Sequence, residues 1–385
     1  MYNIKLMNKI APVGTDVFTA DYNVGEAVEN PDGIMVRSAA LHEMAFNDEL
    51  LAIARAGAGV NNIPIDNCSK AGIVVFNTPG ANANAVKELT IAALFLASRN
   101  VTGGVEWAKT LIGDPDCAKL VEKGKSKFEG PEIQGKKLGV IGLGAIGVMV
   151  ANAANHLGME VYGYDPFLSV NAAWELSRKV KKADSMKEIF ANCDYITIHV
   201  PLNPSTKGSI NAEAIAEMKD GVRILNLARG EIVDYDALKA GLESGKIAKY
   251  VTDFPAAETL EMPNTICIPH LGASTPESEN NCAFMAANEL KNYIETGIIK
   301  NSVNMPNMEQ ALDCKTRICI IHENVPNKIA EFTAIMGEAK INIEHLTNVS
   351  KKEMAYSVMD TNDDVPAELI AKINAIDGVI RVRKI

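Results

Sequence analysis

The chain has 385 residues, of which 47% are hydrophobic, 22% charged and 5% aromatic. This length and balance predict a globular protein of about two to four domains and exclude a small module or a disordered chain. Lys and Arg total 38 against 48 Asp and Glu, a formal net charge of −10. That charge disfavours nucleic acid and anionic membranes as partners, so any anionic substrate requires locally placed arginines.

The cysteines and the amino end indicate the compartment. Seven cysteines form no CxxC pair and no Cys/His ladder with metal-ligand spacing, so we expect reduced thiols, no disulfide framework and no metal site. The amino end lacks a long apolar core, and no uncharged apolar run approaches about 18 residues. The sequence therefore predicts a cytoplasmic protein.

The first predicted elements form a parallel sheet. Short apolar runs alternate with segments of helical spacing and end at Gly, Arg or Asn turns. The next element, 85–98, is an apolar helix too short to cross a membrane, and we interpret it as a buried connector. The strands are expected at 4–6, 33–36, 51–54 and 73–76.

A second strand and helix alternation follows a polar stretch rich in Gly, Lys and Glu, 103–135. It predicts one doubly wound parallel unit. Ser274, Thr275, Pro276 and Glu277 then combine a capping hydroxyl, an early proline and an acid, and so predict the start of a helix that ends near Thr296. The strands of this unit are expected at 138–141, 161–164, 195–200, 223–227, 250–252 and 265–268.

The carboxyl-terminal region has a different order. Residues 301–313, with Pro306 and Asn307, have weak periodicity and indicate a linker. Beyond them the pattern predicts a ferredoxin-like βαββαβ module. Its elements are expected at 317–321, 327–337, 341–349, 354–360, 366–375 and 379–383.

The motif GLGAIG, which begins at Gly142, is the sharpest chemical signal. An apolar strand precedes it and a helical pattern follows it. Gly142 suits the tight turn, Gly144 the close approach of backbone to a pyrophosphate, and Gly147 the packing of helix on sheet. Asp165 lies 23 residues beyond Gly142 at the end of the next strand. Its carboxylate would accept hydrogen bonds from the adenosine ribose and repel a 2′-phosphate, so NAD is expected rather than NADP.

Three candidate catalytic residues follow predicted strands, where ligands of open α/β sheets bind. They are Arg229 in NLARGEIVD, Glu258 in TDFPAAE and His270 in PHLGAST. Together with GLGAIG and HVPL, these motifs resemble the D-isomer-specific 2-hydroxyacid dehydrogenases, in which an Arg, a Glu and a His in this order form the catalytic set. The resemblance extends over nearly the whole chain.

This resemblance implies a mechanism. His270 would be the general base, Glu258 would hydrogen-bond and orient its imidazole, and Arg229 would hold the substrate carboxylate and the oxygen at C2. Only 12 positions separate Glu258 from His270, so Glu261 is an alternative, but Glu258 keeps the five-residue offset from Asp253. The NAD contacts implied by the motifs are Gly142, Gly144, Ala145, Ile146, Gly147, Asp165, His199, Pro201, Thr206, Leu227, Ala228, Arg229, Asp253, His270, Leu271, Gly272 and Ala273.

The amino-terminal region is similar to the substrate-binding part of the phosphoglycerate dehydrogenases within this family. The similarity implies that Arg37, with Ser38, and Arg55 help to hold a phosphate. Backbone N–H groups near Ala58 and Gly59 would meet the carboxylate, and Asn82 would lie at the rim.

The carboxyl-terminal module resembles an ACT domain, a regulatory fold that often binds amino acids. His322, Asn324 and Asn342 match residues that contact serine in serine-sensitive relatives. Asn327 stands where the family usually has Gly, and Asn tolerates positive φ better than most residues. The alternative is a module that only pairs sheet edges between subunits.

The expected protein is α/β, with a flavodoxin-like substrate domain, a Rossmann NAD domain and a ferredoxin-like ACT module. It would oxidise D-3-phosphoglycerate with NAD in serine synthesis, respond to serine and form a homodimer or homotetramer. A glycerate, hydroxypyruvate or 2-oxoglutarate reductase of the same family is the nearest rival, and a non-catalytic NAD sensor is the rival of another class. The expected boundaries are 1–98 and 275–304 for the substrate domain, 99–274 for the NAD domain, 305–315 for the linker and 316–385 for the ACT module.

Overall fold

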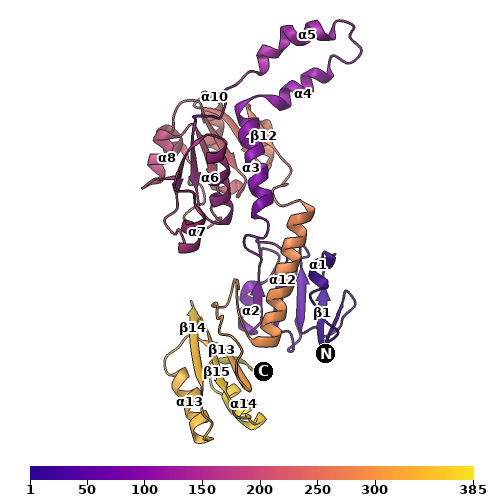
Figure 1. Cartoon of the computed structure of the whole chain (residues 1–385), viewed down its shortest axis with the longest axis vertical. Helices are drawn as coiled ribbons and strands as arrows, with labels where there is room; N and C mark the ends of the chain where they lie inside the picture. The colour runs from indigo at the N-terminus through magenta and orange to yellow at the C-terminus, as the bar shows by residue number, and fades with distance from the viewer. The chain divides into compact units, whose positions relative to one another are not determined.

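The computed structural model describes residues 1–385. The chain divides into two compact units, one of Met1–Asn82 with Glu279–Ile385 and one of Ala83–Ser278. Figure 1 shows the helices and strands of both units. No helix in the chain combines the length and the apolar character needed to cross a membrane.

The first unit contains a parallel five-stranded sheet in the order β2-β1-β3-β4-β5. This order is that of flavodoxin-like folds. Strand β2 was not predicted, because it is a short edge strand whose sequence, YNVG, has no apolar run. The strands are β1 (Tyr2–Leu6), β2 (Tyr22–Gly25), β3 (Gly33–Val36), β4 (Ala52–Arg55) and β5 (Val74–Phe76).

Both faces of this sheet are buried, as the continuous apolar runs of its strands require. On β3, Ile34 and Val36 enter one core, whereas Met35 enters the other and packs with Leu290 of the long helix α12. Thr275, rather than Ser274, caps that helix by accepting a hydrogen bond from the N–H of Ser278 at 3.1 Å. The helices are α1 (Pro12–Thr15), α2 (Ile65–Lys70) and α12 (Pro276–Thr296).

The same unit ends in a four-stranded antiparallel sheet of order β14-β15-β13-β16, with two helices in the observed sequence βαββαβ. The strand predicted at 341–349 begins only at His345, which pairs with Asp360 close to the end of β15 at Thr361. The elements are β13 (Thr316–Glu323), α13 (Lys328–Glu338), β14 (His345–Lys351), β15 (Met354–Thr361), α14 (Ala367–Asn374) and β16 (Val379–Lys384).

The two faces of the antiparallel sheet have different neighbours. Ile318 and Ile320 pack under α13 and α14 with Phe332. The opposite face, including Tyr356, belongs to the same hydrophobic core as Tyr293 of α12. The terminal module therefore shares a core with the helix that closes the parallel sheet.

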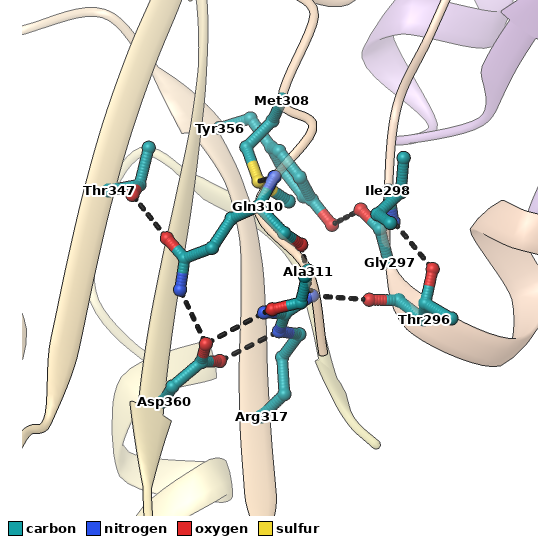
Figure 2. Close-up of polar contacts among 10 residues, drawn as sticks. All are labelled: Thr296, Gly297, Ile298, Met308, Gln310, Ala311, Arg317, Thr347, Tyr356 and Asp360. Atoms are coloured by element: carbon teal, nitrogen blue, oxygen red, sulfur yellow. Dashed lines mark hydrogen bonds and ion pairs between the residues drawn. The ribbon is translucent and has the colours of Figure 1, made fainter. Parts of the chain in front are cut away.

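Arg317 is the polar centre of this junction (Figure 2). Its side chain is fully buried, and two of its nitrogens donate to the carboxylate of Asp360 at 2.7 Å each. The remaining N–H groups donate to the carbonyls of Thr296, Gln310 and Ala311 at 2.8–3.0 Å. Thr296 ends α12, so one guanidinium caps that helix, holds the linker and pairs with β15.

The second unit contains a parallel seven-stranded sheet of order β12-β11-β10-β9-β6-β7-β8. Six of these strands have the order of the Rossmann dinucleotide fold. The order in which successive strands are added to the sheet reverses between β6 and β9, which is the topological switch point. The prediction of two parallel-sheet regions is thus confirmed. The strands are β6 (Lys137–Ile141), β7 (Glu160–Tyr164), β8 (Lys181–Lys182), β9 (Tyr195–Ile198), β10 (Val222–Asn226), β11 (Ile247–Thr252) and β12 (Thr265–Cys267).

Helices cover both faces of this sheet and bury two separate cores. The connector helix is observed as α3 and packs on α6. The helices are α3 (Ala83–Ser98), α6 (Ala145–His156), α7 (Val170–Glu175), α8 (Met186–Asn192), α9 (Ala212–Glu217), α10 (Tyr235–Glu243), α11 (Ala257–Glu261) and the 3-10 turn η2 (Gly230–Ile232).

The polar stretch after α3 is helical and extends from this unit as an arm (Figure 1). It contains α4 (Val101–Lys109), α5 (Cys117–Gly124) and the 3-10 turn η1 (Lys125–Phe128). Helix α4 has no buried residue, and the main apolar contact of the arm is between the rings of Trp107 and Phe128 at 5.3 Å. Its helices therefore lack the buried stripe that a sequence pattern reveals.

Candidate active site

The glycine-rich turn between β6 and α6 forms an open cradle. Gly142 has φ 93°, and a Cβ atom there would lie 2.7 Å from the carbonyl oxygen of His199. A Cβ atom on Gly147 would lie 1.9 Å from the carbonyl oxygen of Gly142. A Cβ atom on Gly144 would meet nothing within 4 Å. Two glycines are thus required by close backbone contacts, and the third leaves room beside the free N–H groups of Ala145 and Ile146 at the start of α6.

Asp165 is fixed at the end of β7 beside this cradle. One carboxylate oxygen accepts a hydrogen bond from the N–H of Leu143 and the other from the N–H of Phe167, both at 2.8 Å. Each oxygen keeps a further lone pair for a ribose hydroxyl. The carboxylate is therefore oriented by the glycine-rich loop itself.

Two loops on the other side of the switch point are held by local hydrogen bonds. The ring nitrogen Nε2 of His199 lies 2.9 Å from the hydroxyl of Thr197, and burial lowers the pKa of His199 to about 4. His199 is therefore neutral at physiological pH. The hydroxyl of Thr206 donates to the carbonyl of Pro201 at 2.6 Å and closes the following loop.

Asp253 lies buried at the end of β11, with only 1% of its surface exposed. Its Oδ2 accepts a hydrogen bond from the N–H of Gly272 at 3.0 Å, whereas its Oδ1 has no partner. Burial raises the pKa of this carboxyl above its usual value. A buried acceptor without a donor is costly, and a carboxamide N–H of a nicotinamide ring is a donor of the required kind. The unpaired Oδ1 of Asp253 and the open space at Gly144 both fit NAD.

His270 and Arg229 are brought together around the ring of Phe254. The imidazole of His270 and the ring of Phe254 have centroids 4.6 Å apart with a 44° angle between planes. The Cζ of Arg229 lies 5.5 Å from the centroid of Phe254. The backbone of His270 has φ 40°. Such a positive φ is uncommon outside glycine and frequently marks functional positions.

Glu258 is placed differently from the expectation. It is exposed on the short helix α11, and no hydrogen bond joins it to His270. A cavity of about 380 Å³ beside His270 is instead lined by Glu231, Tyr235 and Phe254. Sequence reasoning missed these three residues, although Glu231 and Phe254 stand inside NLARGEIVD and TDFPAAE and Tyr235 directly follows the first of these motifs.

The remaining cofactor candidates lie near these groups on the same unit. Leu227 is buried after β10, and the N–H groups of Ala228 and Arg229 both donate to the amide oxygen of Asn226, at 3.2 and 3.3 Å. Leu271 is 47% exposed and Ala273 half-buried, on the segment that follows His270.

The substrate candidates of the first unit gather at the carboxyl edge of its parallel sheet. Arg55 donates from Nε to the carbonyl of Arg37 at 3.1 Å, and Nη2 of Arg37 lies 2.6 Å from the carboxylate of Glu279. The N–H groups of Arg37, Ser38 and Ala39 all donate to the amide oxygen of Asn8 at 2.9–3.1 Å.

The other candidates of this unit follow β4 and β5. The carbonyl of Ala58 accepts a hydrogen bond from the amide of Asn77 at 2.6 Å. Gly59 and Asn82 are half-buried. The structure therefore brings the side chain of Arg55 against the backbone of Arg37.

The effector candidates do not hydrogen-bond one another. His322 is buried, with Nδ1 2.8 Å from the carbonyl of Glu323 and Nε2 2.9 Å from the hydroxyl of Ser357. Asn324 donates to the carbonyl of Lys352 at 3.0 Å, and the exposed Asn342 donates to Glu344 at 2.8 Å. Asn327 has φ 76°, the left-handed conformation for which Asn is suited.

Comparison with known proteins finds a matching family model and several relatives of this chain. The family model "D-isomer specific 2-hydroxyacid dehydrogenase, NAD binding domain" matches residues 92–272. A D-3-phosphoglycerate dehydrogenase of Haemophilus influenzae is 33% identical over 350 residues, which are 87% of this chain and 81% of that protein. The enzyme of the same name from Methanocaldococcus jannaschii is 34% identical over 80% of this chain, which spans only 58% of its length.

A solved structure shows the same arrangement of elements. The chain is similar to an NAD⁺-bound 3-phosphoglycerate dehydrogenase of Entamoeba histolytica, with a TM-score of 0.62 and 27% identity. The similarity covers 80% of this chain and 99% of that protein.

Proposed function

Since the chain belongs to the D-isomer specific 2-hydroxyacid dehydrogenase family, we propose that it oxidises D-3-phosphoglycerate to 3-phosphohydroxypyruvate, the entry into serine synthesis. NAD is the cofactor. Asp165 and Asp253 would hold it beside the glycine-rich turn, and it would supply a nicotinamide ring as the hydride acceptor. The observation that carries the proposal is the placement of Arg229 and His270 on one aromatic ring, next to the buried and half-satisfied Asp253.

Each residue of this group has a defined task in the reaction. His270 takes the proton of the C2 hydroxyl as the C–H bond breaks, so the electron pair of that bond leaves as hydride and the C2 oxygen becomes a carbonyl. Arg229 holds the substrate carboxylate with its planar fork, and Asp253 offers its free oxygen to the carboxamide of the cofactor. Glu258 is retained as the carboxylate that pairs with His270 in the substrate complex. In the structure the two are not hydrogen-bonded.

The phosphate of the substrate is assigned to Arg37 and Arg55, and the carboxylate to the N–H groups near Ala58 and Gly59. The ends of the neighbouring strands β3 and β4 support this assignment, because there the side chain of Arg55 donates to the backbone carbonyl of Arg37. Two arginines at one sheet edge provide local positive charge in a protein of net charge −10. Asn82 is assigned to the rim of the same site.

The terminal βαββαβ module is proposed to be an ACT domain that binds serine. The left-handed backbone of Asn327 supports this, because Gly, the usual residue of the family at this position, adopts that conformation readily. Asn324 and Asn342 are exposed, whereas His322 is buried and lies within hydrogen-bond distance of Ser357 and Glu323. A titration with L-serine that leaves the initial rate and the molecular mass unchanged would contradict this role.

NADH formation by the purified full-length protein tests the activity. D-3-phosphoglycerate and D-glycerate form the matched pair of substrates, and we expect turnover of the first at much higher kcat/KM. His270→Asn should lose about 10²- to 10⁴-fold in kcat while it still binds NAD. Equal efficiency with D-glycerate would move the assignment to an unphosphorylated substrate. The absence of any turnover alongside NAD binding would favour a sensor.

A further inference from the structure

Phe254 is anchored by the backbone that surrounds it. It directly follows the buried Asp253, its N–H donates to the hydroxyl of the buried Thr252 at 3.0 Å, and Pro255 restricts the chain on its other side. Its Cβ lies 3.6 Å from where a Cβ atom on Gly230 would stand. The position of the aromatic ring is therefore set by the end of β11 and by η2.

The imidazole of His270 depends on this ring for its orientation. The backbone N–H of His270 points to the carbonyls of Asp253 and Ile268 at 2.9 Å each, which fixes the main chain at its positive φ. The imidazole nitrogens, by contrast, make no hydrogen bond. The contact of the imidazole with the ring of Phe254, at 4.6 Å, is the ring contact that it makes.

We propose that Phe254 is a positioning residue for hydride transfer, which holds the His270 base and the Arg229 guanidinium at a fixed separation. This inference rests on the function proposed above. The face of an aromatic ring attracts cations within about 6 Å. Arg229 is always charged, and His270 becomes charged when it takes the hydroxyl proton, so one ring suits both groups at the moment of reaction. A group without the aromatic face provides neither the stacking surface nor this attraction.

Phe254→Leu and Phe254→Tyr form the test pair. Leucine keeps an apolar side chain but removes the ring, and tyrosine keeps the ring. We expect kcat with D-3-phosphoglycerate to fall about 10- to 100-fold in Phe254→Leu, as for a misplaced catalytic group, with the affinity for NAD and the thermal midpoint near the wild-type values. Phe254→Tyr should recover most of the lost kcat. A wild-type kcat in Phe254→Leu, or an equal loss in both variants, would overturn the proposal.

A spectroscopic measurement tests the geometry without turnover. In the wild-type protein the ring current of Phe254 shifts the proton resonances of the His270 imidazole, which are assigned by their loss in His270→Asn. We expect the shift to disappear in Phe254→Leu and to persist in Phe254→Tyr. An unchanged shift in Phe254→Leu would show that the rings are not in contact and would refute the proposal even if the wild-type protein oxidises phosphoglycerate. The shift is measurable even if the proposed substrate is wrong, so the two failures are distinguishable.

Discussion

Replacing Arg317 with methionine tests the junction between the terminal module and α12. Methionine fills much of the same volume but removes the charge and all the N–H donors. Asp360, of which 1% is exposed, is then left buried without its partner. Removal of one member of a buried ion pair costs about 3–5 kcal/mol, because the remaining charge is uncompensated. We therefore expect the free energy of unfolding of this unit to fall by about that amount.

The double variant Arg317→Met/Asp360→Leu is the matched control. It also loses the hydrogen bonds to the carbonyls of Thr296, Gln310 and Ala311, but it leaves no buried charge. Replacing both members of a buried pair by apolar residues is often close to neutral, so the double variant should be more stable than the single one. The difference between the two variants isolates the cost of the unpaired carboxylate.

Urea unfolding followed by two signals measures these effects. Both tryptophans, Trp107 and Trp174, lie in the unit Ala83–Ser278, so their fluorescence reports on that unit alone. Tyrosine circular dichroism includes the buried Tyr293 and Tyr356 of the other unit. The circular dichroism transition should shift to lower urea in Arg317→Met. An unmoved transition, or a double variant as unstable as the single one, would refute the reasoning.

Three further predictions concern the cofactor, the pH dependence and the substrate. Gly147→Ala should lower the affinity for NAD by at least about tenfold in a fluorescence titration. The new Cβ would lie 1.9 Å from the carbonyl oxygen of Gly142 and push α6 off the sheet. An unchanged affinity would contradict the assignment of the glycine-rich turn to NAD. Burial raises the pKa of Glu289 to about 8, so the folded state holds a proton that the unfolded state loses near pH 4.5. The contribution of Glu289 to the free energy of unfolding is complete below pH 4.5 and falls by about 1.4 kcal/mol per pH unit up to about pH 8. The free energy of unfolding of Glu289→Gln, measured in urea, should lack this slope. Parallel pH profiles for the wild type and the variant would contradict the assignment. Arg37→Ala should raise KM for D-3-phosphoglycerate far more than KM for NAD. Glu279→Gln releases Arg37 from its 2.6 Å ion pair and should lower KM for D-3-phosphoglycerate. If KM for D-3-phosphoglycerate is unchanged in both variants by steady-state kinetics, Arg37 is excluded from the phosphate site.

The strands of the sheets were easier to predict from the sequence than the polar helices were. The strands around Val140, Ile196 and Ile224 are fully buried on both faces and were recognisable as apolar runs. The arm of α4 and α5 gave no such signal, because its side chains are exposed and its helices are supported by pairs such as Lys109 with Glu106 at 2.8 Å. Strands β2 and β8 are short edges, which need few apolar residues.

The glycines and several charged residues of the candidate site were predictable from the sequence, whereas Glu231, Tyr235 and Phe254 were not. Glycines, Asp165, Arg229 and His270 stand in motifs whose spacing reflects backbone geometry and charge. Phe254 gave no separate signal, because an aromatic residue at a strand end is usually a core residue. The orientation of Glu258 depends on the conformation of the short helix α11, which spacing along the chain does not specify.

Helix α12 gives the carboxyl-terminal module an unusual kind of attachment. The helix starts six residues after His270 and ends under the guanidinium of Arg317, and its Tyr293 is buried in a core that Tyr356 completes. The module is therefore not a detachable appendage. A stop codon in the linker would expose the apolar face of α12 that Tyr293 shares with the module, so the shortened protein should aggregate.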